Sequence, residues 1–303
     1  FLVIVPEQFT MQTQKDLVMM HPRRGIMNID VLSFERLAHR VFEEVGGEHR
    51  KILEDTGKNL ILRRLAEEKK DELTLLGGNM KKLGYISEIK SLLSEFTQYR
   101  VTSTQLEEMM ERNQNNPQLY FKLKDMKVIY DSFQAYLEGT YLTAEELLGA
   151  LEQTVERSEA VQGSVIVLDG YTGFTPVQLS LLKKLLALAE RVSVTLTMDA
   201  AEDPFAPGAE YELFHMTKKT IRSLVTLAEE AKVPVEKPVL LKDAGSCRFL
   251  QAPALGFLES AVFRRRKRSW EKETEEVALY AAYSPRAEVE MVGERIQRLV
   301  RDE

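Results

Sequence analysis

Cysteine is almost absent from this sequence, and its scarcity excludes several classes of protein. Cys247 is the only cysteine among 303 residues, so the chain can form no internal disulfide and no cysteine-ligated zinc site or cluster. The four histidines, His21, His39, His49 and His215, are scattered without metal-ligand spacing. The sequence therefore predicts no metal site within these residues.

Long hydrophobic runs and a strong excess of one charge are also missing. No apolar stretch approaches the roughly 18 residues that a membrane span needs, and no signal-peptide pattern opens the chain. Hydrophobic residues make up 44% and charged residues 29%, which is typical of a soluble globular protein. The net charge of −6 argues against a protein that coats nucleic acid throughout, but it permits a local basic face. We expect a cytoplasmic protein without membrane contact.

The phosphate-binding loop of many ATPases, GxxxxGK[ST], occurs nowhere in the sequence. Even so, Val165–Leu168 runs straight into Asp169, as a buried parallel strand does when it delivers an acid to a nucleotide site. Gly170 then stands where a working ATPase of this kind usually has a glutamate that activates water. Two interpretations stay open from the residues alone. Asp169 either belongs to a disabled magnesium–nucleotide site or only caps the tight turn at Gly170.

Strand and helix patterns alternate along much of the chain. Short apolar runs predict strands over 1–5, 29–32, 164–168, 192–198 and 277–283. Ser33 is placed to cap the helix that follows the second run, and Thr175-Pro-Val-Gln178 carries the signature of a capping box. Helical periodicity returns over 211–232, and Ser284 with Pro285 begins a last amphipathic helix. This alternation predicts a parallel α/β sheet.

Residues 48–158 interrupt that alternation. Strand-like runs are almost missing there, and apolar residues recur at helical spacing, for example from Ile86 to Phe96 and from Leu119 to Leu137. We interpret this stretch as an all-helical insertion. The chain opens on FLVIVPE without a methionine and closes inside a predicted helix, so we also expect it to be a fragment of a longer protein.

Two polar segments could contact nucleic acid, or they could have only a structural role. Glu7, Gln8 and Thr10 in VPEQFT could contact a nucleic-acid backbone, or they could cap the next helix. The Arg264–Arg268 cluster beside Trp270 could meet phosphates. Glutamates follow that cluster at once, which favours a solvated linker with local charge pairing.

Four segments, in order and spanning nearly the whole chain, resemble one family. They are IVPEQFT from Ile4, VLSFERLAHRVFEEVGG from Val31, VIVLDGYTGFTPVQLSLLKKL from Val165 and YAAYSPRAEVEMVGERIQRLV from Tyr280. Together they resemble the N-terminal half of AddB, the B subunit of bacterial AddAB or RexAB-type helicase-nucleases. VPEQFT and DGYTGFTPVQ are the most specific parts of this resemblance.

The resemblance implies the fold of a superfamily 1 helicase: a RecA-like, P-loop NTPase-type parallel sheet with a large all-helical insertion. On that basis residues 1–47 and 159–270 form one discontinuous RecA-like domain. Residues 48–158 form the insertion, and residues 275–303 are the truncated start of a second RecA-like domain.

The same resemblance implies which residues face ligands. VPEQFT corresponds to a helicase segment that often faces single-stranded DNA, which implies a DNA-facing surface at Glu7, Gln8, Thr10, Ser33 and Phe34.

VIVLDGYTGFTPVQ corresponds to the Walker B region. It implies that Asp169 is the relic of a magnesium-holding acid and that Gly170 marks weak or lost ATP hydrolysis.

Partners and cofactors are implied only for the intact subunit. The family acts with an AddA partner, which supplies the motor, in DNA double-strand break repair and homologous recombination. The B subunit scans DNA for the Chi hotspot and cuts one strand with a C-terminal nuclease domain that carries a 4Fe-4S cluster. ATP, Mg²⁺ and that cluster are not expected in these residues, so we expect the fragment alone to be inactive.

Two other functions remain open at this point. An active superfamily 1 DNA helicase motor would hydrolyse ATP without help from a partner. A protein-interaction scaffold would use residues 48–158 as a docking surface and make no DNA contact.

Overall fold

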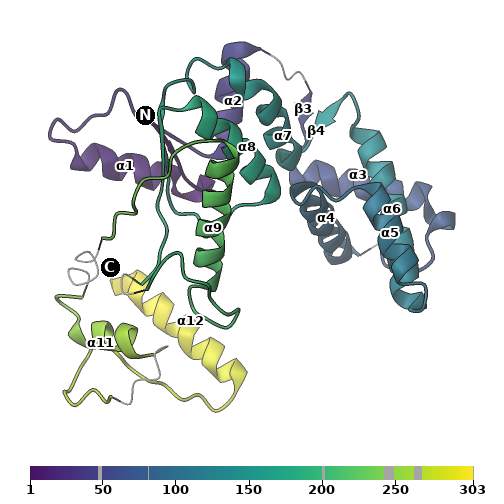
Figure 1. Cartoon of the computed structure of the whole chain (residues 1–303). Helices are drawn as coiled ribbons and strands as arrows, with labels where there is room; N and C mark the ends of the chain where they lie inside the picture. The colour runs from purple at the N-terminus through teal and green to yellow at the C-terminus, as the bar shows by residue number, and fades with distance from the viewer. Residues whose placement is uncertain (47–49, 81, 200–201, 242–248, 263–267, 303) are drawn as a thin grey trace. The chain divides into compact units, whose positions relative to one another are not determined.

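The computed structural model describes all residues except 47–49, 81, 200–201, 242–248, 263–267 and 303 (Figure 1). Cys247, His49 and most of the Arg264–Arg268 cluster therefore lie outside the described residues. The chain divides into two compact units, Phe1–Glu236 and Lys237–Glu303. In the part that the structure describes, no helix is long and apolar enough to cross a lipid bilayer.

A parallel sheet lies at the centre of the first unit. Its strands are β1 (Leu2–Ile4), β2 (Asp30–Leu32), β5 (Val165–Leu168) and β6 (Arg191–Val194), in the spatial order β2-β1-β5-β6. Leu2 is aligned with Asp30 on one side and with Ile166 on the other. The prediction of a parallel α/β sheet that is interrupted and then resumed is confirmed. β6 ends at Val194, earlier than the expected 198.

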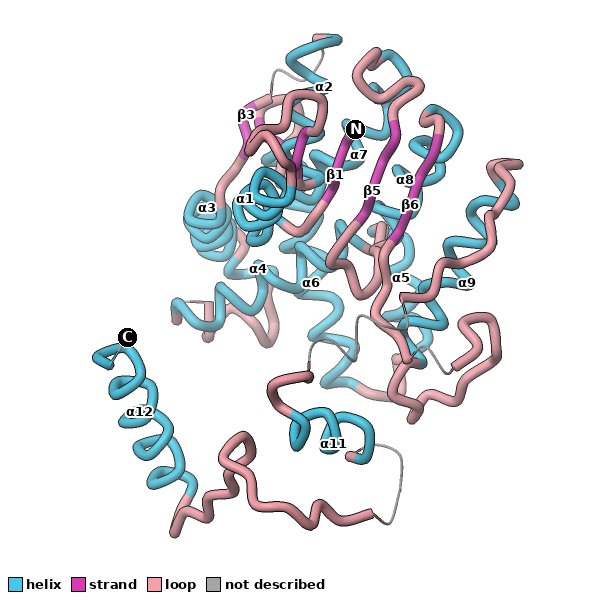
Figure 2. Tube along the Cα trace, turned by 90° about the vertical axis from the view of Figure 1, so that its left-hand side faces the viewer, coloured by secondary structure: helices cyan, strands magenta, loops and turns pink. Residues whose placement is uncertain are grey.

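One face of the sheet carries the larger hydrophobic core. Helices α2 (Phe34–Val45), α7 (Ala144–Thr154) and α8 (Pro176–Leu188) contribute to it. Ile4, Ile166 and Leu168 on the strands are fully buried in this core. Figure 2 shows β1, β5 and β6 side by side along α7 and α8. The unit also contains α1 (Thr10–Met20) and α9 (His215–Glu230).

The capping signals in the sequence act as predicted. The Ser33 hydroxyl accepts a hydrogen bond from the Arg36 amide at 3.2 Å and caps α2. Thr175 and Gln178 form a reciprocal capping box at the start of α8, with Pro176 as the first helical residue. The chain therefore enters α2 directly after β2, and it enters α8 at the end of the loop over residues 169–175.

The inserted segment has a hydrophobic core of its own. Its helices are α3 (Asp55–Glu68), α4 (Leu83–Gln98), α5 (Ser103–Arg112) and α6 (Pro117–Leu137), and the buried side chains of α3, α4 and α6 form the second core. We call α3–α6 and the loops between them the helical block.

Two features differ from the predicted all-helical insertion. Strands β3 (Lys51–Ile52) and β4 (Tyr141–Leu142) pair in parallel where the chain crosses into and out of the helical block. Pairing satisfies backbone groups that two extended crossing segments would otherwise leave without partners. The second difference is α7, which lies within 48–158 in sequence but buries Leu147 and Leu151 in the core of the sheet.

The second unit contains helices α11 (Pro253–Ala261) and α12 (Pro285–Asp302). The predicted last helix is confirmed, but the predicted strand over 277–283 is wrong, because these residues form no strand. A strand requires a neighbouring backbone to receive its hydrogen bonds, and none of the described residues supplies one here. The aromatic rings of Phe257 and Trp270 pack 5.5 Å apart in this unit.

Candidate functional site at the carboxyl edge of the sheet

The parallel strands bring the loops after each of them to one edge of the sheet. Ser33 follows β2, Pro6 and Glu7 follow β1, Asp169 follows β5 and Thr195 follows β6. β2 lies on one side of β1 and β5 on the other, so the strand order reverses between β1 and β5. Open α/β sheets bind ligands at such a switch point. The structure therefore brings the predicted residues from both sides of the insertion to one place.

Asp169 lies at this edge with an exposed side chain. Its amide donates a hydrogen bond to the Ile4 carbonyl at 3.0 Å, which fixes it beside the end of β1. Its carboxylate accepts a hydrogen bond from the Thr195 hydroxyl, which joins the loops after β5 and β6. Among the described residues, no group of three or more histidine, cysteine, aspartate or glutamate side chains is placed to hold a metal ion. Asp169 thus has a structural partner within the chain.

Gly170 has a backbone conformation that favours glycine. Its φ is +78°, and a Cβ built on it would lie 3.4 Å from Pro6 Cδ and 3.7 Å from Phe9 Cδ2. A side chain in this left-handed region costs roughly 1–2 kcal/mol. A water-activating glutamate would be strained at this position. The backbone here therefore disfavours the residue that a working ATPase usually carries after the strand acid.

Glu7 and Arg36 form an ion pair across the edge. The Glu7 carboxylate accepts a hydrogen bond from Arg36 Nε at 2.9 Å, and Arg36 Nη2 lies 2.8 Å from the same oxygen. A hydrogen bond from Ser33, helped by Arg36, holds the pKa of Glu7 below its usual value against the opposing effect of burial. Arg36 does not stand out in the sequence, where its position one turn after Ser33 is the available signal. The loops after β1 and β2 are therefore joined by charge.

We expect Ser33→Ala to raise the pKa of Glu7 toward its ordinary value and to destabilise the start of α2 by about 1 kcal/mol. The pKa of Glu7 is lower in the folded chain than in the unfolded chain, so the ionised carboxylate stabilises the fold. This stabilisation is fully present at pH values above the unfolded pKa. That contribution is lost as pH falls through the lower folded pKa. An NMR titration of the Glu7 carboxyl in wild type and variant tests the shift. Ser91→Ala, at an exposed serine of α4, is the control, and an unchanged Glu7 pKa in the Ser33 variant would contradict the prediction.

Three of the predicted DNA-facing residues have buried side chains with local partners. Thr10 donates a hydrogen bond to the Glu7 carbonyl at 2.9 Å, and Ser33 caps α2. Phe34 packs on Tyr171 with ring centroids 5.5 Å apart. All three are no more than 5% exposed. These buried side chains stabilise the loops at the edge, and their role toward DNA stays a prediction.

The exposed side chains at the edge come from the loop after β1. Glu7 and Gln8 are exposed, and so is Phe9, with 45% of its surface accessible. The sequence alone did not single out Phe9, because the exposure of one aromatic residue depends on tertiary packing. Tyr171, also missed, packs on Phe174 at 5.2 Å, and burial followed by the nearby Glu7 charge raises the pKa of its phenol. The edge thus presents a polar and aromatic surface.

Comparison with known proteins decides the family. The family model described as "ADDB, N-terminal" matches residues 1–259, and this range includes all of the edge residues. The chain belongs to the AddB N-terminal family. The resemblance seen in VPEQFT and DGYTGFTPVQ is thereby confirmed.

Curated AddB relatives match along the whole chain, and each is named as the B subunit of an ATP-dependent helicase/deoxyribonuclease. The relative from Lachnoclostridium phytofermentans is 42% identical to it, and that from Caldanaerobacter subterraneus is 37% identical, each across 100% of this chain. The protein of the same name from Bacillus cereus is 35% identical, also across 100% of the chain. The chain spans only 27%, 26% and 26% of these three relatives' own lengths.

Proposed function

We propose that this chain is the N-terminal part of the B subunit of an ATP-dependent helicase/deoxyribonuclease that acts in DNA double-strand break repair and homologous recombination. One observation supports this role above the others. The two most specific AddB-like segments, VPEQFT and DGYTGFTPVQ, meet at the switch point of the sheet, where Pro6 lies against Gly170. Ligand-binding loops are expected at that position.

In this proposal the sheet is a RecA-like helicase domain made of residues 1–47 and 159–270, with residues 48–158 inserted. Residues 275–303 begin the second RecA-like domain. The intact subunit works as a cytoplasmic heterodimer with an AddA-type partner, scans DNA for Chi, and carries its 4Fe-4S cluster outside these residues. The ATP site is degenerate, because the backbone at Gly170 disfavours a glutamate and Asp169 is engaged by Thr195.

The DNA contact that the edge supports best is with a single strand. The Phe9 ring is exposed and can stack on a base, and Gln8 beside it can donate to a phosphate oxygen. Arg36 supplies a positive charge whose side chain is 55% exposed while it remains held by Glu7. An aromatic ring with a cation and an amide beside it is the composition of a surface that binds single strands without reading sequence.

The proposal predicts that Phe9→Ala weakens binding of a single-stranded oligonucleotide by the intact AddA–AddB complex. Loss of one stacking platform is worth about 1–3 kcal/mol, which corresponds to roughly 5- to 150-fold in affinity. Arg36→Gln should lower the slope of log affinity against log salt by about 0.7, the value for one phosphate contact on a single strand. Fluorescence anisotropy at several salt concentrations measures both quantities.

Met11→Ala is the matched control, because Met11 is 81% exposed on the first turn of α1 and close in sequence. Equal affinities for wild type and the Phe9 variant would remove the DNA role of this edge and favour a scaffold without DNA contact. Robust DNA-stimulated ATP hydrolysis by AddB without AddA would instead favour an active motor.

A further inference from the structure

The paired strands β3 and β4 separate the two hydrophobic cores of the first unit. Ile52 and Leu142 are aligned with each other and face the core of the sheet. Their chain neighbours Leu53 and Tyr141 belong to the core of the helical block. Side chains of an extended segment alternate between its two sides, so this short pair sends one set of residues into each core. Among the described residues, the two cores have no buried member in common.

Helix α7 presents different kinds of side chain to the core of the sheet and to the helical block. Leu147 and Leu151 on α7 and Val155 directly after it are spaced four residues apart and are buried against the sheet. Glu145 and Glu152, two turns apart, have side chains that are only 13% exposed and point to cations of the helical block. α7 thus directs two carboxylates to the block, whereas its buried leucines face the sheet.

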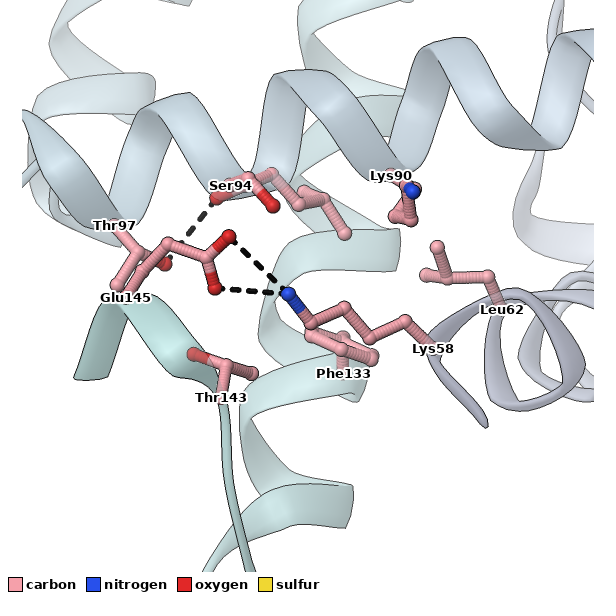
Figure 3. Close-up of a pocket in the computed structure, with 9 residues that line it drawn as sticks. Lys58, Leu62, Lys90, Ser94, Thr97, Phe133, Thr143 and Glu145 are labelled. Atoms are coloured by element: carbon pink, nitrogen blue, oxygen red, sulfur yellow. Dashed lines mark hydrogen bonds and ion pairs between the residues drawn. The ribbon is translucent and has the colours of Figure 1, made fainter. Parts of the chain in front are cut away.

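The first of these ion pairs joins α7 to α3. Lys58 Nζ lies 3.1 Å from Glu145 Oε1 and 2.9 Å from Oε2, and the lysine side chain is only 4% exposed. Figure 3 shows the Lys58 ammonium directed at both oxygens of the Glu145 carboxylate. Burial alone would raise the pKa of Glu145, but hydrogen bonds from Lys58 and Ser94 outweigh it, and its pKa is lowered. The space left in this pocket is about 10 Å³, room for one water molecule, so it is a packed contact and not a ligand site.

The second ion pair joins α7 to the end of α4. Arg100, in the loop directly after α4, pairs with Glu152. The other oxygen of Glu152 accepts a hydrogen bond from Ser180 of α8 at 2.6 Å. Glu152 is thus held by the sheet unit on one side and by the block on the other. Neutralising one member of such a buried pair leaves the other charge without its partner, which weakens the contact without opening either apolar core.

We infer that the helical block is a separately folded body that turns about the β3–β4 pair, and that Lys58–Glu145 and Arg100–Glu152 are the latch that holds it against α7. Each core stays closed when the latch opens, because the β3–β4 pair already divides their side chains. This rotation of the helical block goes beyond the DNA role proposed above and does not depend on it. It gives the subunit a way to reposition the block without unfolding either core.

Single-molecule energy transfer on the intact AddB protein with its AddA partner tests the latch. Dyes are attached through bio-orthogonal residues in place of the exposed Gln118 on α6 and Ala187 on α8. Wild type should give one narrow distance distribution at low salt. Combining Glu145→Gln with Glu152→Gln should raise the fraction of molecules at a second distance at least ten-fold.

Two variants that remove the same charge serve as controls. Glu68→Gln breaks an ion pair with Arg64 inside the block, and Glu230→Gln breaks one with Lys183 inside the sheet unit. Both should keep the wild-type distribution. Hydrogen exchange of β5 and α6 amides should stay slow in the double variant, as expected for two intact cores. An unchanged distance distribution, or loss of protection in both cores together, would overturn the inference.

Discussion

Replacing Asp125 with alanine is expected to destabilise the helical block by about 3–5 kcal/mol, because three amide groups lose the buried carboxylate that accepts from all of them. The Asp125 carboxylate on α6 is fully buried. It accepts hydrogen bonds from the amides of Thr74 at 2.9 Å, Leu75 at 2.6 Å and Leu76 at 2.9 Å. The loop between α3 and α4 therefore depends on one side chain that lies about fifty residues away in sequence.

Hydrogen exchange of the α6 amides, combined with thermal unfolding, measures this loss. Asp131→Ala is the matched control on the same helix. Its carboxylate pairs with Lys127 and is 41% exposed, so its removal should cost no more than about 1 kcal/mol. Similar effects of the two substitutions would mean that the 74–76 loop finds other partners for its amides.

Leu151→Ala is expected to have the second large effect, about 2–5 kcal/mol, and to act on the sheet rather than on the helical block. Leu151 on α7 is fully buried among the side chains that cover the sheet, including Ile166 of β5 and Leu181 of α8. Truncation leaves a cavity in that core and removes contacts that the block does not share.

Exchange rates of the β5 and α8 amides should therefore rise in the Leu151 variant, while those of α6 stay close to wild type. Leu60→Ala removes the same atoms from a leucine that is 62% exposed on α3, and it should change stability by less than about 0.5 kcal/mol. If hydrogen exchange became faster in α6 than in α8, Leu151 would stabilise the helical block rather than the sheet, and the prediction would be wrong.

Local signals in the sequence predicted the elements that border the candidate site. The apolar run before Asp169 forms a central strand, and Thr175–Gln178 forms the expected capping box. Ser33 caps α2 as its position suggested. These predictions succeeded because a cap or a buried strand is determined by neighbouring residues and their hydrophobic pattern.

Predictions failed where a distant partner decides the outcome. The run over 277–283 has the composition of a strand, but no described segment pairs with it. Arg36 and Phe9 were overlooked because their place at the edge depends on which loops meet across the sheet. Only the structure shows that the backbone at Gly170 has a positive φ beside Pro6.

By itself, the sequence determined the family, the alternation of strands and helices, and the acid that follows β5, because motifs and periodicity are properties of neighbouring residues. Tertiary structure alone decided that α7 joins the core of the sheet and that Glu145 and Glu152 meet Lys58 and Arg100. The physical reason is that burial and ion pairing depend on the packing of segments far apart in the chain. A helical pattern shows that a face is apolar, but only packing determines which core that face enters.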